Sequence, residues 1–114
     1  MNLHSYMDSM ALQQKSGERP SRPLNTEGRA MISDLADSIT KQFPPQYFGD
    51  LINNTSSHTW TIESYNLAVE KVYAFVLKNK QVTQEWHDDM YKLCRERVAL
   101  AGYRLANMIA SIYK

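Results

Sequence analysis

Hydrophobic residues recur every three or four positions through most of this chain, the spacing typical of amphipathic helices. The first such segment starts at Leu3 and is predicted to be helical as far as about Lys15. Two prolines and a glycine between Ser16 and Pro23 then predict a loop, because neither residue type continues a helix well. The apolar stripe of this first helix is Leu3, Met7, Met10 and Ala11.

A second helix is predicted after this loop. Asn25 or Thr26 can cap it, and Glu27 in its first turn favours the positive end of the helix dipole. Pro44-Pro45 predicts its end. Its apolar face is expected to contain Ile32, Leu35, Ala36 and Ile39.

A third helix is expected to start near Ser57 or Thr59, after a weakly patterned stretch with one short helical turn at Tyr47–Leu51. Val72–Leu77 is rich in β-branched and aromatic residues, which also suits a strand. No second strand-like run exists to pair with it, so we predict helix. The expected stripe is Trp60, Tyr65, Ala68, Val69, Val72, Tyr73 and Val76.

A long fourth helix is predicted to follow a loop at Asn79-Lys80-Gln81, capped by Thr83 and running almost to the C-terminus. Gly102 lies inside this helix, where glycine costs stability relative to alanine, and this predicts a close helix–helix crossing. The pattern as a whole predicts an all-α fold. The stripe of this helix is Trp86, Met90, Leu93, Cys94, Ala101, Leu105, Met108, Ile109 and Ile112.

Size and charge limit the classes of function. At 114 residues the chain is long enough for one modest core, and its formal charge of +1 excludes a strong general attraction to nucleic acid or anionic membranes. Its apolar stretches are too short and interrupted for a transmembrane helix. His4 and Asp8 stand where a signal peptide would have its apolar core, so we expect none. The single Cys94 cannot form an internal disulfide.

His4 and Asp8 are the candidate ligands for a metal ion. Four residues apart on a helix, their side chains lie on one face, and an imidazole beside a carboxylate is half of a zinc site. The spacing by itself also fits an ordinary surface hydrogen bond. His58 is expected beside a helix cap, and His87 on a solvated helix face, so neither is predicted to be a ligand.

Three arginines of the last helix, Arg95, Arg97 and Arg104, are candidates for contact with phosphate. The alternative is that they form the polar side of an amphipathic helix. The sequence has no glycine-rich phosphate loop, no cysteine pair and no nucleophile elbow.

Three elements in order give the chain a family resemblance. Asn2-Leu3-His4-Ser5-Tyr6-Met7-Asp8-Ser9 resembles the Asn-Leu-His-x-x-x-Asp-Ser element of the class I zinc-dependent single-strand nucleases and 3′-nucleotidases. Trp60-Thr61-Ile62-Glu63-Ser64 is similar to that family's Trp-x-x-Glu-Ser helix start. The run from Arg97 to Ala106 resembles its closing helix, Arg-x-Ala-x-Ala/Gly-Gly-x-Arg-Leu-Ala. Their order and spacing extend the resemblance over essentially the whole chain.

The resemblance implies an all-α domain with a cluster of three zinc ions that hydrolyses phosphodiester bonds and 3′-phosphomonoesters in single-stranded RNA and DNA. It also implies secretion. His4 and Asp8 match the last two zinc ligands of the family. The other ligands lie upstream of this motif in the family, and neither His58 nor His87 matches one. Met7 stands where the family commonly has tryptophan, which is expected to loosen packing around the pair.

We therefore expect residues 1–114 to form one partial domain, the C-terminal portion of a zinc nuclease, with little or no activity as an isolated chain. Its partners would be single-stranded nucleic acid or 3′-nucleotides, with no membrane. Helix faces left uncovered are expected to cause self-association or loose packing. The alternative is a non-catalytic helical module. A related zinc-dependent phospholipase C is less favoured, because the Trp-x-x-Glu-Ser and Gly-x-Arg-Leu-Ala elements point to the nucleases.

Overall fold

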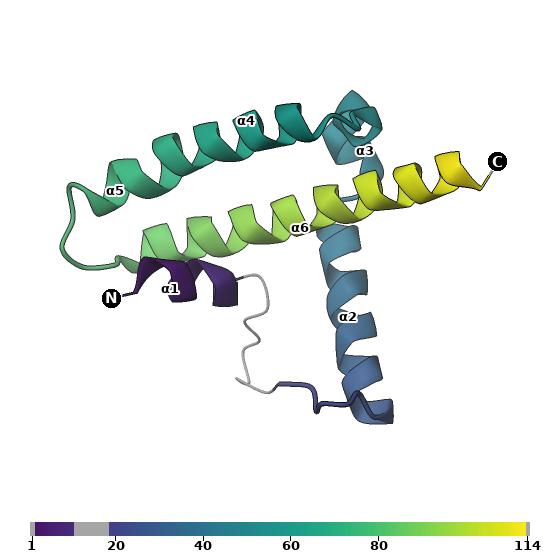
Figure 1. Ribbon diagram of the computed structural model, residues 1–114. Coiled ribbons are helices and arrows are strands. Elements are labelled where there is room, and N and C mark those ends of the chain that lie inside the picture. The colour runs from purple at the N-terminus through teal and green to yellow at the C-terminus, as the bar shows by residue number, and fades with distance from the viewer. Residues whose placement is uncertain (1, 11–18, 114) are drawn as a thin grey trace.

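The computed structural model describes residues 2–10 and 19–113, and every regular element in these residues is helical, as predicted (Figure 1). Helices α1, α2, α3, α4, α5 and α6 are joined by a 3₁₀ segment, η1, and a π-helical segment, η2. In chain order the elements are α1 (Leu3–Met10), α2 (Thr26–Gln42), α3 (Pro45–Phe48), η1 (Gly49–Asn53), α4 (Ser57–Leu67), η2 (Ala68–Tyr73), α5 (Ala74–Val76) and α6 (Gln84–Ile112).

The long helix α6 is the axis of the molecule (Figure 1). The arm made of α4, η2 and α5 runs back along α6 in the opposite direction. The short α1 lies beside the N-terminal half of α6, and α2 projects away from its C-terminal half. The principal extents are 50 × 36 × 23 Å. This open arrangement leaves one helix, α6, to hold all the others together.

The predicted helix starts are confirmed at two of the caps. The Asn25 side chain accepts a hydrogen bond from the backbone N–H of Gly28 at 2.7 Å, and Thr83 accepts one from Trp86 at 3.2 Å. The third predicted helix starts at Ser57, with Ser56 as its cap. The short helical turn expected near Tyr47 is present as α3 and η1. The predicted extension of the first helix beyond Met10 lies outside the described residues.

The stripe predicted for the third helix is only partly correct. Val72 is buried and Trp60 half-buried, whereas Tyr65, Val69 and Tyr73 are exposed. The π-helical segment explains part of this, because each π-turn holds an additional residue and rotates the side chains that follow. A single helix, α6, also covers only one side of this arm. The opposite side therefore stays open although its residues are apolar.

Two separate clusters of buried side chains form the core. One joins the end of α2 and α3 to the middle of α6 through Ile39, Phe43, Phe48, Ala99 and Leu100. The other joins α1 and η2 to the start of α6 through Met10, Val72, Trp86 and Met90.

The stripe predicted for the last helix is buried only at its start. Trp86 and Met90 are buried, but Ala101, Leu105 and Ile109 are exposed. The crossing predicted at Gly102 is absent, because a Cβ atom built on this residue meets nothing within 4 Å. The positions of the C-terminal half of α6 that are buried face α2 and η1 instead, at Ala99, Leu100 and Arg104.

Candidate metal site

Helix α1 presents the two candidate ligands. Asn2 caps it, since its side-chain oxygen accepts a hydrogen bond from the backbone N–H of Ser5 at 3.1 Å. The helix has eight residues, too few to be stable alone in water. Its position therefore depends on packing against α6. The motif Asn-Leu-His thus combines a helix cap with the first candidate ligand.

His4 and Asp8 meet on the exposed face of this helix. His4 Nε2 lies 3.1 Å from Asp8 Oδ2, and the two side chains are 85% and 67% exposed. Two ligand atoms on one tetrahedral zinc ion, each about 2.05 Å from the metal, are roughly 3.3 Å apart. The pair can therefore take a zinc ion between these two atoms with a shift of a few tenths of an ångström.

Contacts on the other face of α1 hold the pair in place. The ring of Tyr6 stacks on that of Trp86, with centroids 5.8 Å apart, and its hydroxyl lies 2.6 Å from His87 Nδ1. Burial, with the negative charge of Asp88, raises the pKa of the Tyr6 hydroxyl, so it stays protonated and able to donate to this nitrogen. Met10 is fully buried. The prediction of a solvated His87 is wrong, because the packing of α1 covers it.

The described residues do not complete a metal site. No group of three or more His, Cys, Asp or Glu side chains within residues 2–10 and 19–113 is placed to hold an ion. His58 is exposed at the start of α4, and His87 is engaged by Tyr6. A hollow of about 380 Å³ adjoins Asp8, but its lining is mainly apolar: Met7, Leu67, Ala68, Val72, Leu93, Cys94 and Val98, with Asp8, Ser64 and Arg97.

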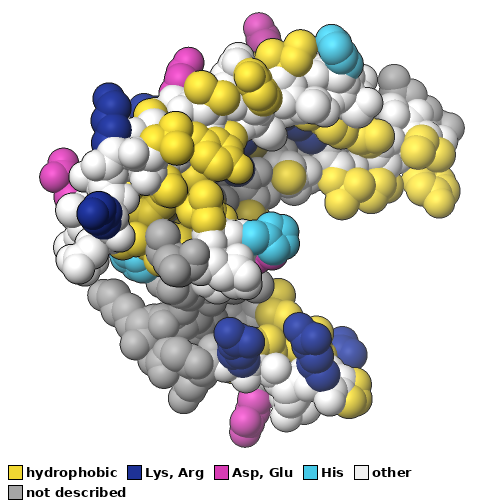
Figure 2. Space-filling view, turned by 60° about the vertical axis from the view of Figure 1, so that its left-hand side comes forward, with side chains coloured by type: hydrophobic (Ala, Val, Ile, Leu, Met, Phe, Trp, Pro, Cys, Tyr) yellow, Lys and Arg dark blue, Asp and Glu magenta, His cyan; other side chains and the backbone are white. Residues whose placement is uncertain are grey.

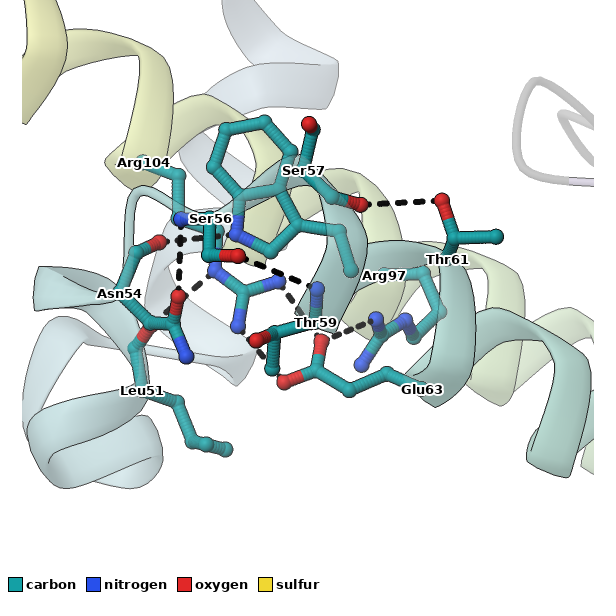
Figure 3. Close-up of polar contacts among 10 residues, drawn as sticks. Leu51, Asn54, Ser56, Ser57, Thr59, Thr61, Glu63, Arg97 and Arg104 are labelled. Carbon is teal, nitrogen blue, oxygen red and sulfur yellow. Dashed lines mark hydrogen bonds and ion pairs between the residues drawn. The ribbon is translucent and has the colours of Figure 1, made fainter.

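The two downstream elements of the sequence meet around one carboxylate, that of Glu63 (Figure 3). Arg104 donates from its two terminal nitrogens to the two oxygens of Glu63, at 2.8 Å each. Arg97 adds a third bond, at 3.0 Å. This is the bidentate geometry that makes an arginine–carboxylate pair strong. The carboxylate from α4 therefore ties this helix to two positions of α6 that lie about two turns apart.

Further contacts extend this cluster to η1. Arg104 Nε donates to the backbone carbonyl of Leu51 at 3.0 Å, and its guanidinium lies over the Trp60 ring, 5.5 Å from the centroid. Trp60 Nε1 donates to the carbonyl of Asn54 at 2.8 Å. Arg104 and Glu63 thus fix the start of α4 and the end of η1 against α6 (Figure 3). The Trp-x-x-Glu-Ser and Gly-x-Arg-Leu-Ala elements of the family resemblance therefore serve to pack α4 and η1 against α6.

The contacts of Arg95 and Arg104 contradict both interpretations of these arginines, as phosphate-binding residues and as the polar side of an amphipathic helix. Arg104 and Arg95 are buried, at 4% and 5% exposure, so neither forms a solvated helix face. Arg95 donates to Ser38 Oγ at 2.8 Å and to Gln42 Oε1 at 3.2 Å, which anchors α2. Its guanidinium also lies over the Tyr91 ring. Both side chains are occupied by contacts within the protein, so contact with phosphate is not their role in this fold.

The charge state of Glu63 follows from this environment. Hydrogen bonding to Arg104 is the largest influence and lowers the pKa of the carboxyl, although its partial burial acts in the opposite direction. Arg97 lowers the pKa further. Glu63 is therefore ionised at neutral pH, and its charge offsets that of the buried Arg104.

Comparison with known proteins places this fold in a family. A family model described as S1/P1 Nuclease matches residues 1–114, the whole chain. The chain belongs to the S1/P1 nuclease family. No curated protein and no solved structure gives a significant match. The S1/P1 nuclease family is zinc-dependent and acts on nucleic acids. Among the described residues, none of the helices combines the length and hydropathy that a membrane span requires.

Sequence reasoning missed two features of this S1/P1 nuclease chain. It named Glu63 only as part of the Trp-x-x-Glu-Ser element and did not pair it with an arginine. A signal was available, because Arg104 is the one charged residue between Val98 and Tyr113, and a lone charge in an apolar helix usually has a buried partner. The contact between Tyr6 and His87 had no such signal, because their positions are 81 residues apart.

Proposed function

We propose that this chain is the C-terminal portion of a zinc-dependent nuclease domain, and that it supplies two zinc ligands, His4 and Asp8. The supporting observation is the 3.1 Å separation of His4 Nε2 and Asp8 Oδ2 on one helix face, in a chain matched over its full length by the S1/P1 nuclease family. The domain hydrolyses phosphodiester bonds, and 3′-phosphomonoesters, in single-stranded RNA and DNA.

The chemistry of the two donors suits zinc. Neutral imidazole nitrogen and carboxylate oxygen are both common zinc ligands. Zinc, when bound, supplies Lewis-acid stabilisation of charge at the phosphate. The residues of this chain hold and orient the two donors. Asn2 fixes the start of α1, and Tyr6 and Met10 fix its docking on α6. The helix that carries the two donors is therefore already folded, and metal binding does not have to order it.

A complete catalytic zinc site normally uses three protein ligands, and a cluster of three ions needs more. His4 and Asp8 are two. The remaining ligands of the proposed centre must therefore come from residues other than those described. We expect the isolated 114-residue chain to bind zinc weakly and to cleave single-stranded DNA at or near background.

Zinc titration by calorimetry tests the ligand assignment, using the untagged chain. We expect weak binding that is lost in His4→Ala and in Asp8→Ala and is unchanged in His58→Ala, the matched control for an exposed histidine. Binding that survives His4→Ala would refute the assignment. A parallel assay follows cleavage of single-stranded DNA with excess zinc. Robust turnover abolished by His4→Ala would show that the chain assembles a full catalytic centre, and would refute its proposed incompleteness.

The second candidate is a non-catalytic helical module. The observation that favours it is the packing role of Glu63, Arg97 and Arg104, which needs no metal. It predicts no zinc binding, with unchanged helicity and unfolding in His4→Ala and Asp8→Ala. The calorimetric titration therefore separates the two candidates.

A further inference from the structure

Two overlapping acceptor sequences for an N-linked glycan lie between η1 and α4. The acceptor pattern is Asn-x-Ser/Thr, in which the middle residue is any except proline. Asn53-Asn54-Thr55 fits this pattern, and so does Asn54-Thr55-Ser56. No other asparagine of the sequence is followed by serine or threonine two positions later. Because so short a pattern also occurs by chance, the surroundings of the two asparagines decide whether it can be used.

The segment has the exposure that a modified site needs. Asn53 is the last residue of η1, and the next three residues form the link to α4, which starts at Ser57. Asn53, Thr55 and Ser56 are exposed, and the backbone of Asn54 is extended, with φ −78° and ψ 113°. N-linked glycans are bulky, hydrated groups that occupy the surface of a protein. The link between η1 and α4 is therefore a segment on which a glycan can be carried.

The side chain of Asn53 has a free amide nitrogen. Its Oδ1 accepts a hydrogen bond from Nδ2 of Asn107 at 3.4 Å, and its own Nδ2 donates to no other described residue. Asn107 also donates to the backbone carbonyl of Ile52 at 3.0 Å, so α6 holds this end of η1 by its backbone as well. The nitrogen that would carry a glycan is thus not needed for packing.

The neighbouring Asn54 is engaged in the fold. Its Oδ1 accepts a hydrogen bond from the backbone N–H of Ser56 at 2.9 Å, and its backbone carbonyl accepts one from Trp60 Nε1 at 2.8 Å. It is half-buried and lies beside Arg104 (Figure 3). A glycan on this residue would crowd the cluster that fixes α4 on α6. Of the two overlapping acceptors, Asn53 is therefore the one that the folded chain accommodates.

We propose that Asn53 is a site of N-linked glycosylation when the chain is exported. The donor is an oligosaccharide carried on a lipid diphosphate, and a transferase of the secretory compartment catalyses the reaction. Asn53 Nδ2 forms a bond to the first sugar carbon while the bond from that carbon to the diphosphate oxygen breaks. The lipid diphosphate leaves, and the amide releases one proton. The proposal depends on export, which the family resemblance implies, and not on zinc or on the nuclease reaction.

The proposed site is far from the candidate metal ligands. Helix α1 contacts α6 at His87, and η1 contacts it at Asn107. These two positions are twenty residues apart on one helix, which corresponds to about 30 Å. Figure 1 likewise shows α1 and α3 at different ends of the molecule. A glycan at Asn53 therefore leaves His4 and Asp8 open to a metal ion and to further ligands.

The surface near Asn53 contains little charge, and a glycan would make it more hydrophilic. Leu51 is 46% exposed, and Ile109 in the last turns of α6 is 48% exposed. Between positions 98 and 113 the one charged residue is Arg104, which is buried. Figure 2 shows mainly hydrophobic and uncharged side chains over the upper part of this hook-shaped molecule. A hydrated oligosaccharide solubilises such a surface. A glycosylated Asn53 faces solvent, so no other part of the domain covers it.

Expression of the full 114-residue chain behind a cleavable signal peptide, in a eukaryotic cell, tests the proposal. We expect a glycan on the chain, seen as a shift in gel mobility that peptide N-glycosidase removes. This amidase leaves an aspartate side chain where the glycan was, so peptide mass spectrometry identifies the modified position. Asn53 should be converted and Asn54 unchanged. Secreted and cell-retained chains are analysed alike. A wild-type chain without a glycan, or with its glycan on Asn54, would overturn the proposal.

A matched pair of substitutions separates the two overlapping acceptor sequences. Thr55→Ala removes the pattern at Asn53 and keeps it at Asn54, whereas Ser56→Ala does the reverse. We expect the glycan to be lost in Thr55→Ala and retained in Ser56→Ala. Ser56 accepts only a long hydrogen bond from the backbone N–H of Thr59, at 3.4 Å, and circular dichroism confirms that both variants remain helical. Every other combination of loss and retention would overturn the assignment to Asn53.

Discussion

Removing the carboxylate of Glu63 is the most informative perturbation of this fold. In Glu63→Ala, Arg104 remains buried and loses its bidentate partner, while Arg97 loses its one hydrogen bond. What remains for Arg104 is the carbonyl of Leu51 and the face of the Trp60 ring. Neither of these carries a negative charge, so a guanidinium with 5% side-chain exposure would be left without a counter-charge.

The size of the effect follows from this burial. Breaking a buried ion pair by removing one partner typically costs about 3–5 kcal/mol. The Glu63 side chain is 20% exposed, so water can reach part of the vacated space, and we expect the lower end, about 3 kcal/mol. A chain of 114 residues has a free energy of unfolding of about 6–17 kcal/mol. The substitution therefore removes a substantial part of the total stability.

Urea unfolding followed by tryptophan fluorescence measures this loss, because Trp60 lies in the cluster. With a denaturant dependence of about 1.5 kcal/mol per molar, the midpoint should fall by about 2 M. All variants are compared at one chain concentration, because association shifts apparent stability. Arg97→Ala should lose only about 0.5–1 kcal/mol, since Arg97 makes one partly exposed contact. Glu70→Ala, an exposed carboxylate of the same arm, should change stability by less than about 0.5 kcal/mol.

Two results would contradict this reasoning. A Glu63→Ala variant within about 0.5 kcal/mol of the wild type would mean that water or another group satisfies Arg104. A loss in Arg97→Ala as large as that in Arg104→Ala would mean that the bidentate pair is not the dominant contact.

Two further predictions follow from shifted pKa values. Hydrogen bonding to Arg104 lowers the pKa of Glu63 in the folded chain, so its stabilisation is complete above its ordinary pKa of 4.5 and is lost as the pH falls through the lower folded value. The difference in urea midpoint between the wild type and Glu63→Gln should therefore shrink between pH 7 and pH 3, and a constant difference would contradict this. Burial raises the pKa of the Cys94 thiol, so Ellman's reagent should modify it slowly at pH 8. Met10→Ala should accelerate the reaction by loosening α1, and an unchanged rate would mean that α1 does not protect the thiol.

Local signals in the sequence were sufficient to predict where the helices lie. Asn25 and Thr83 cap where predicted, and Pro44-Pro45 ends α2 as expected. These features depend on residues within one turn of each other, and a side chain that satisfies a backbone N–H acts in the same way in any fold. The helical spacing of His4 and Asp8 is local in the same sense, and the two atoms do lie 3.1 Å apart.

The sequence by itself thus determined an all-α chain, the caps at Asn25 and Thr83, the end of α2 at Pro44-Pro45, and the face shared by His4 and Asp8. Tertiary structure decided which apolar stripes are buried, because α6 covers one side of the arm made of α4 and η2 and leaves the side with Tyr65 and Val69 open. It also decided that Glu63 binds Arg104 across 41 positions and that Tyr6 binds His87 across 81. Such pairs form only when packing brings together helical turns that are distant in the sequence. Helical periodicity shows which face of a helix is apolar, but it does not show which other helix packs against that face.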